Sequence, residues 1–361
     1  MLFRNVRVFD GVSGTVSAAQ DVLVRGNHIE RIAAGLADEP GAQVIDGAGK
    51  VLMPGLIDAH WHSMMAAPSL GAILNGDHRY LTAIAVAEST RTLMRGFTTV
   101  RDIGGNSFGL KQAVDEDVLP GPRIYPSGAM ITVTSGHGDF RHAGDLPRTM
   151  GAPGPTDLEG DTAIADSPDE VRMRVREQLM RGASQIKLTA GGGVSSPHSP
   201  LDAVTFTPAE LRAATEAAGN WGTYVTVHAY TPKAIREAIE AGVKVIEHGS
   251  LMDDDTARLI SQKGVWLSIQ PFPDALAEAF PPGSFERQKA DEVFAGNNHA
   301  YDLAKKYKLK TAWGTDVLFS AALATQQGAI LASLTRWYTP GETLVMATGT
   351  NGELLQLTGK R

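Results

Sequence analysis

The chain of 361 residues contains no cysteine. This absence excludes disulfide bonds, thiolate metal ligands and a cysteine nucleophile. The sequence also lacks the ~18 consecutive apolar residues that a membrane span requires. Its N-terminus, MLFRNVRVFD, has neither the basic nor the apolar segment of a signal peptide. We therefore expect a cytoplasmic protein without a membrane partner, in which any metal ion is held by histidine, carboxylate or a less common ligand.

Basic residues are fewer than acidic ones, 33 against 40, so the net charge is −7. An acidic balance argues against nucleic acid and anionic membranes as partners. Hydrophobic residues make up 43% of the chain, which is enough to bury a large core. A chain of this length fits one (β/α)₈ barrel with a small companion domain.

Two textures divide the chain. Residues 1–53 consist of short alternating runs broken by glycine and asparagine, with a turn at Gly26-Asn27, and they predict a small β domain. Residues 54–361 alternate strand-like and helical stretches, and several helices open with a capping residue followed by proline, as at Ser167, Thr207 and Thr231. This alternation predicts a (β/α)₈ barrel. Two long segments, 130–165 and 271–297, are expected to be loops over the barrel mouth.

We expect eight barrel strands. They are GLIDAHWH, FTTVRDIG, RIYPSGAM, QIKLTAG, YVTVHAY, KVIEHGS, VWLSIQP and KTAWGTD.

Polar residues stand at the ends of five of these strands. They are His60, His62, Lys187, His228, His248 and Asp316. Barrel enzymes keep their active sites at the carboxyl ends of the strands. A single strand-end histidine is more often a satisfied core residue, and the His60–His62 pair alone could arise by chance on a half-buried strand. Four histidines and an aspartate at one end of one barrel instead favour a metal site.

Imidazole and carboxylate ligands suit Zn²⁺, Co²⁺ or Mn²⁺. Lys187 differs from the other five because an ammonium has no lone pair for a cation. Two interpretations are open: the lysine forms an ion pair with Asp316 or a glutamate of the mouth, or CO₂ adds to its amine. The resulting carbamate would be an anion with two oxygens, able to bridge two metals.

The strand-end motifs resemble those of the binuclear branch of the amidohydrolase superfamily. The resemblance is carried by PGLIDAHWH, GFTTVRDIGG, GPRIYPSGAMITVTSGHGD, QIKLTAGGGVSSP, YVTVHAYTPKAI, AGVKVIEHGSLMD and WGTD, and it extends from the N-terminus to about residue 358. Within that superfamily, SGHGD and HAY resemble the metal-dependent carboxypeptidases and N-acyl amino acid amidases, which include prolidase-like and ochratoxin-hydrolysing enzymes.

The resemblance implies a role for each strand-end residue. His60, His62 and Asp316 would bind the more buried of two divalent ions, with zinc expected, and His228 and His248 would bind the second. A carbamate on Lys187 would bridge both ions together with a hydroxide. Asp316 would move the proton between water and leaving amine, which is the ordinary task of a general acid–base.

Two further residues receive roles at the substrate. By the same resemblance, His137 would help to hold the substrate carbonyl; the alternative is a loop histidine satisfied by backbone. Tyr230 follows His228 by two residues, shares its face and could donate to a substrate carboxylate. It could equally be a plain tyrosine of the mouth. Arg141 and His142 follow on the same predicted loop as His137, where they are either solvated surface or a source of positive potential.

The substrate implied is a small N-acyl amino acid or dipeptide with a free carboxylate. A cyclic amide or imidazolone ring is the alternative within the superfamily, and a non-catalytic binding barrel is a remote one. In one respect the chain departs from the family: it stops at LLQLTGKR, before the strands that usually complete the small domain. Either the sequence is truncated, or the small domain is built from its N-terminal strands alone. An open sheet edge would be prone to pairing with another chain, and we expect a homo-oligomer.

Overall fold

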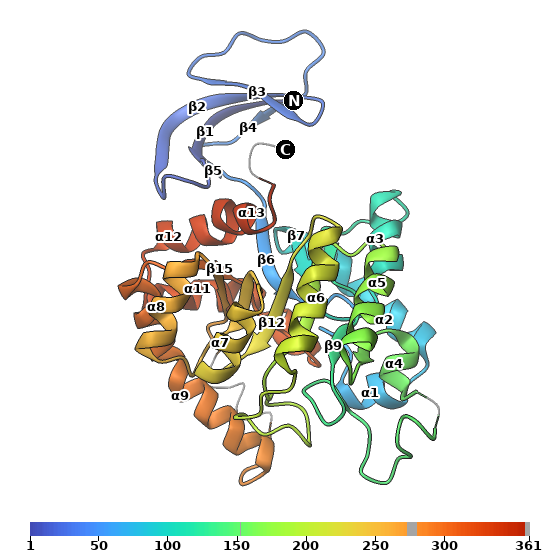
Figure 1. The fold of residues 1–361 in the computed structure, drawn as a ribbon. Coiled ribbons are helices and arrows are strands. Elements are labelled where there is room, and N and C mark those ends of the chain that lie inside the picture. The colour runs from blue at the N-terminus through green and yellow to red at the C-terminus, as the bar shows by residue number, and fades with distance from the viewer. Residues whose placement is uncertain (152, 273–279, 358–361) are drawn as a thin grey trace.

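The first 53 residues form a sheet of their own. The structure, a computed structural model, describes residues 1–151, 153–272 and 280–357. The five strands of the small sheet are β1 (Leu2–Phe9), β2 (Val16–Arg25), β3 (His28–Ala33), β4 (Val44–Asp46) and β5 (Val51–Leu52). They run in the order β3-β2-β1-β4, β5 also pairs with β1, and the β1–β2 and β2–β3 pairs are antiparallel. This sheet lies at the top of Figure 1, above the rest of the molecule.

The remaining strands form the barrel. They are β6 (Leu56–Trp61), β7 (Phe97–Asp102), β8 (Arg123–Pro126), β9 (Met130–Thr132), β10 (Thr162–Ile164), β11 (Ile186–Thr189), β12 (Val225–Ala229), β13 (Val245–His248), β14 (Trp266–Ile269) and β15 (Lys310–Trp313). Their pairs are parallel and form two ladders, β6-β7-β8 and β10-β9-β11-β12-β13-β14-β15. The backbone N–H of Asp316, just after β15, donates to the carbonyl of His60 on β6 over 2.8 Å, and so joins the last strand to the first. The (β/α)₈ architecture with a small N-terminal β domain is thereby confirmed.

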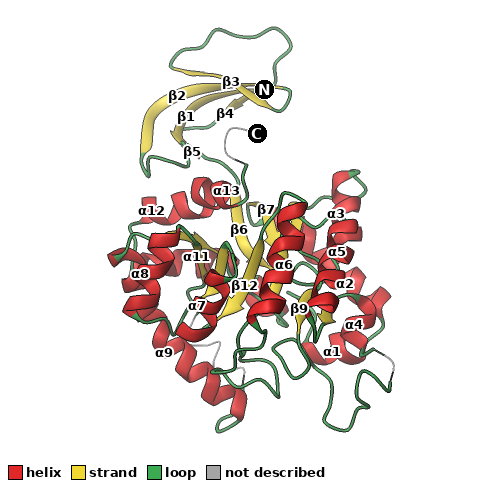
Figure 2. Cartoon of the chain, in the orientation of Figure 1, coloured by secondary structure: helices red, strands yellow, loops and turns green. Residues whose placement is uncertain are grey.

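Helices surround these strands (Figure 2). They are α1 (Leu70–Asn75), α2 (His78–Met94), α3 (Phe108–Asp115), α4 (Pro155–Glu159), α5 (Pro168–Met180), α6 (Pro208–Asn220), α7 (Pro232–Glu240), α8 (Asp254–Lys263), α9 (Phe285–Lys306), α10 (Ala321–Ala324), α11 (Gln327–Ser333), η2 (Leu334–Arg336), α12 (Pro340–Val345), η3 (Met346–Thr350) and α13 (Asn351–Leu354). The helix starts expected at Ser167, Thr207 and Thr231 are all present, and Thr207 forms a full capping box with Glu210. None of the helices in the described ranges is both long enough and apolar enough to cross a bilayer.

Three sequence predictions were wrong. The third predicted strand is two strands, β8 and β9, which belong to different ladders, because Ser127–Gly128 interrupts it and Gly128 has φ +71°. The segment 130–165 is not all loop, since it contains β9, α4 and β10. The segment 271–297 was likewise predicted to be loop, but α9 begins at Phe285 with Ser284 capping its N-terminus; residues 273–279 lie outside the described residues.

The barrel core consists of small and branched side chains. Val100, Ile131, Leu188, Val227 and Ile246 are fully buried. Such near-continuous apolar runs are typical of strands covered on both faces. The core holds the strands rigidly, so the residues that leave it at the carboxyl ends have well-defined positions. Those ends face the long loops at the bottom of Figure 2, opposite the small sheet.

Candidate metal centre and active site

The six strand-end residues converge on one buried space. His60, His62, Lys187, His228 and His248 are at most 3% exposed. Asp316 Oδ1 lies 3.1 Å from His60 Nε2 and 3.2 Å from His62 Nε2. Ligand atoms of His60, His248 and Asp316 all lie within 4.8 Å of one another, which is close enough for a single ion. We call these six residues the floor of the pocket.

Backbone strain occurs at two positions of this floor. His248 has φ +71° and Asp316 has φ +52°, in the left-handed region that residues other than glycine seldom adopt. Successive side chains of a strand normally point to opposite faces. Glu247 and His248 nevertheless both contact His60, and the left-handed turn at His248 allows this. Observed strain of this kind is concentrated at functional sites.

Each floor histidine uses one ring nitrogen for a protein acceptor. His60 Nδ1 donates to Glu247 over 2.9 Å, and His62 Nδ1 donates to the Gly104 carbonyl over 3.0 Å. His228 Nε2 donates to the Gly192 carbonyl over 2.9 Å, and His248 Nδ1 donates to Gln270 Oε1 over 2.6 Å. Metal-binding histidines are held in this way, because the bond fixes the tautomer and leaves the other nitrogen free. The donor set therefore fits a metal centre.

Lys187 is the residue without a partner. In the described part of the chain its ammonium makes no hydrogen bond and no ion pair, so the expected pair with Asp316 or a mouth glutamate is absent. Burial lowers its pKa to about 8, although the charges of Glu247 and Asp316 oppose this effect. A buried amine with a lowered pKa is partly neutral near pH 7–8, and only a neutral amine can add CO₂. The environment therefore fits a carbamate.

A buried glutamate, Glu247, balances positive charge next to the floor residues. Glu247 accepts hydrogen bonds from His60, from Arg101 Nη2 over 2.6 Å and from Thr226. Burial raises the pKa of Glu247, but the charges of Arg101 and His60 outweigh it and hold the pKa well below its usual range. Burial lowers the pKa of His60, but the negative charges of Asp316 and Glu247 outweigh burial, so the pKa is raised. The negative charges of Asp316 and Glu247 thus favour a positive charge at this position, and a divalent cation that binds His60 and Asp316 would supply one.

The two residues expected at the substrate also line this pocket. Burial, reinforced by the charge of Lys187, lowers the pKa of His137 to about 3, so its ring is neutral. Tyr230 packs its ring against His228 and His248, with centroids 4.6 and 5.1 Å apart. Burial and the charge of Asp316 raise the pKa of Tyr230, so its hydroxyl keeps its proton. Both residues can therefore donate hydrogen bonds into the pocket.

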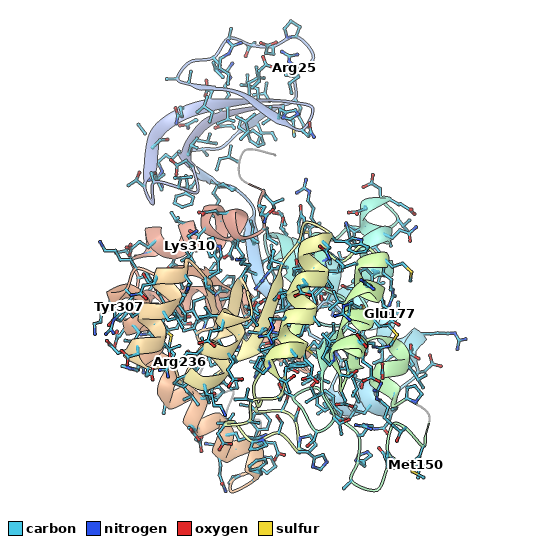
Figure 3. The ribbon with its side chains drawn as sticks, viewed as in Figure 1. Arg25, Met150, Glu177, Arg236, Tyr307 and Lys310 are labelled. Atoms are coloured by element: carbon cyan, nitrogen blue, oxygen red, sulfur yellow. The ribbon has the colours of Figure 1, made fainter. Side chains whose placement is uncertain are left out.

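Arg141 and His142 do not join them. Arg141 pairs with Asp139, through Nε over 2.9 Å and Nη2 over 2.6 Å, and neither it nor His142 lines the pocket. Figure 3 marks Met150, in the same long loop, at the end of the molecule opposite Arg25 of the small sheet. The charge of Arg141 is therefore already paired within this loop.

The walls of the pocket are apolar. They comprise Met130, Phe140, Val194, Phe272, Phe280, Phe294, Val317, Leu318, Phe319, Leu323 and Ile330. Phe272 packs against Phe294 with ring centroids 5.1 Å apart and lies 6.2 Å from the ring of His248. An apolar pocket with a few converging polar groups is the usual form of a small-molecule site.

Sequence reasoning missed the residues that support the site from outside it. Glu247 and Gln270 hold floor histidines, and Ser196 bonds to His137. Only Glu247 carried a signal, as an acidic residue directly before a strand-end histidine. Nothing local in the sequence marks Gln270 or Ser196, because their partners are far away along the chain.

Comparison with known proteins identifies relatives of the chain. Residues 51–348 match the profile of the amidohydrolase family. The ochratoxinase of Aspergillus niger is 30% identical over 288 residues, which are 74% of this chain and 58% of that protein. The sequence of this chain is 35% identical to that of an amidohydrolase of known crystal structure and 32% identical to that of a prolidase crystallised with N-methylphosphonate-L-proline. Both structures superpose on this chain with a TM-score of 0.92, and each comparison covers 99% of this chain and 88% of the other. The chain thus spans less than two thirds of its curated relative.

Proposed function

The chain belongs to the amidohydrolase family, and we propose that it is a binuclear metal-dependent hydrolase of N-acyl amino acids or dipeptides with a free carboxylate. The observation that carries this proposal is the floor. It contains four histidines that each use one ring nitrogen for a protein acceptor, and an aspartate whose Oδ1 faces His60 Nε2 and His62 Nε2. It also contains Lys187, whose ammonium has no hydrogen bond or ion pair among the described residues. Relatives that are named ochratoxinase and prolidase support an amide as the scissile bond.

We assign His60, His62 and Asp316 to one ion, His228 and His248 to the other, and Lys187 to both. CO₂ would add to the neutral Nζ of Lys187 with release of one proton, which leaves an N-linked carboxylate. Two divalent ions, with zinc expected, would supply a nucleophilic water at neutral pH and polarise the amide carbonyl. Two ions per chain by elemental analysis is the expected result.

The chain's own side chains have separate tasks. Asp316 takes a proton from the attacking water and passes it to the leaving amine, so that the amine departs uncharged. His137 donates to the carbonyl oxygen as negative charge develops there. Tyr230 donates to the carboxylate of the leaving amino acid, and the phenylalanine-rich walls accept an apolar acyl group, of which the ochratoxin amide is one example.

The carboxylate requirement is tested with a matched pair of substrates. An N-acyl-phenylalanine should exceed its C-terminal amide by ~10²-fold or more in kcat/KM, because a buried donor made for a carboxylate is left poorly paired by the amide. Tyr230→Phe should shrink that ratio, and Tyr80→Phe, which changes an exposed tyrosine on α2, should leave it unchanged. Equal rates on acid and amide would refute the proposal, and faster opening of a cyclic amide would replace it with the ring-hydrolase alternative.

A further inference from the structure

Ser196 connects two loops next to the pocket. It lies in the segment 190–205 between β11 and α6 and is fully buried. Its Oγ is 2.9 Å from His137 Nδ1 and 2.9 Å from the backbone nitrogen of Gly138. Both partners belong to the other loop, which follows β9. One hydroxyl group therefore determines where the His137 ring lies relative to the floor.

The direction of these two hydrogen bonds follows from their chemistry. The N–H of Gly138 can only donate, so Ser196 Oγ accepts that bond. Among the described residues, the one further polar partner of the buried hydroxyl is His137 Nδ1. A buried hydroxyl proton without an acceptor is costly, so the hydroxyl donates to Nδ1. A neutral imidazole whose Nδ1 accepts must carry its proton on Nε2.

The ring is also confined on its flat side. A Cβ built on Gly193 would lie 2.1 Å from His137 Nδ1, so only glycine permits this approach. The ring of His228 is also near, 4.3 Å away from centroid to centroid. His137 thus packs against a glycine backbone and a floor histidine, and it lines the pocket.

The loop that carries Ser196 is in turn tied to helix α9. Lys289 is 3% exposed, and its ammonium donates to the carbonyls of Gly193, Ser196 and Ser199 over 2.7, 2.8 and 3.3 Å. No carboxylate pairs with it within the described ranges. All three of its protons are therefore used on carbonyls of a single loop, which fixes Gly193 and Ser196 together.

We propose that Ser196 is a positioning residue that holds His137 in the Nε2–H tautomer, and that Lys289 fixes the loop on which this depends. In this form His137 presents an N–H to the pocket, where the opposite tautomer would present a lone pair to the substrate carbonyl oxygen and repel it. The tautomer assignment stands on the contacts alone, and its catalytic meaning rests on the proposed function.

The direct test is nitrogen NMR of zinc-loaded protein labelled with ¹⁵N-histidine, in which the His137 signals are identified by their loss in His137→Asn. The wild-type ring should carry its proton on Nε2. In Ser196→Ala the Nδ1–H form should appear, while Ser199→Ala should retain the wild-type signals. Ser199 is the matched control because it lies in the same loop and its buried hydroxyl has no hydrogen-bond partner in the described structure.

Steady-state kinetics distinguish a positioning role of Ser196 from a role in substrate binding. Ser196→Ala should lower kcat by ~10- to 100-fold, up to the scale of one lost oxyanion donor, with KM and metal content close to wild type. Ser199→Ala should match wild type. A His137 ring protonated on Nδ1 in the wild-type protein would overturn the inference, and this result does not depend on whether Ser196→Ala folds. A folded Ser196→Ala variant with an unchanged tautomer and an unchanged kcat would also overturn it. Failure to hydrolyse any amide would refute the proposed function but leave the NMR result intact.

Discussion

The floor of the pocket and its rim are held by different kinds of contact. The floor residues stand on or directly after parallel strands, whose ladders and buried core fix them. The rim residues His137, Gly193 and Ser196 stand on loops, and these loops are held by side chains such as Lys289 that bond to backbone carbonyls. Under the proposed function, the metal ions would thus depend on the barrel strands, and contact with the substrate carbonyl would depend on the loops.

The largest effect should come from removing the lysine of the floor. Lys187→Ala should abolish detectable hydrolysis, because the proposed bridging carboxylate would be lost. A small carboxylate such as formate should restore part of the activity by supplying two oxygens at the same place. Lys187→Arg should stay inactive with or without formate, because guanidinium remains charged and does not add CO₂. Initial rates and metal content should be measured on the same samples. A Lys187→Ala variant that kept both ions and full activity would contradict this prediction.

The next effect concerns the proton. Asp316→Asn preserves the shape of the side chain but removes the base, so kcat should fall by ~10²- to 10⁴-fold, the scale of general acid–base catalysis. Because Asp316 also faces His60 and His62, metal content must be determined for the same preparation. A variant with two ions and near-normal kcat would remove Asp316 from the mechanism.

A third change removes the buried ion pair between Arg101 and Glu247, next to the floor residues. Glu247→Gln leaves the fully buried guanidinium of Arg101 without its counter-charge. Breaking a buried pair in this way should lower the free energy of unfolding by ~3–5 kcal/mol. Denaturant unfolding of metal-free protein measures this without interference from bound ions, and Glu240→Gln on the exposed side of α7 is the control. Equal stability of the two variants would show that the Arg101–Glu247 pair does not support the floor.

The smallest effect belongs to the rim and depends on pH. Burial lowers the pKa of Lys289 to about 8 from its ordinary 10.5. Between these values the unfolded chain binds a proton that the folded chain has lost, so this residue makes stability rise with pH, by at most ~1.4 kcal/mol per pH unit. Below about pH 8 both states are protonated and the contribution is flat. Urea unfolding of wild type and Lys289→Met across this window should differ in slope, and parallel curves would contradict the lowered pKa.

Predictability followed the same division of the molecule. The barrel was predictable because its helices begin with local caps, such as Thr207 with Glu210, and because its strands are short apolar runs. The third strand was misjudged because a left-handed glycine, Gly128, splits it, and residue composition does not reveal which ladder each half joins. The start of α9 was missed because it follows a segment rich in proline and glycine, although Ser284 caps it.

By itself, the sequence determined the identity of the floor. His60, His228 and Asp316 each end a recognisable strand, and parallel strands in a barrel must bring their carboxyl ends to one face. Only the tertiary structure decided the remainder. It selected Arg101 as the partner of Glu247, turned His248 and Asp316 into the left-handed region, and brought Ser196 to His137 across 59 residues of chain. Such contacts join residues that are distant in sequence, on strands for Arg101 with Glu247 and on loops for Ser196 with His137, and no local pattern of residues encodes them.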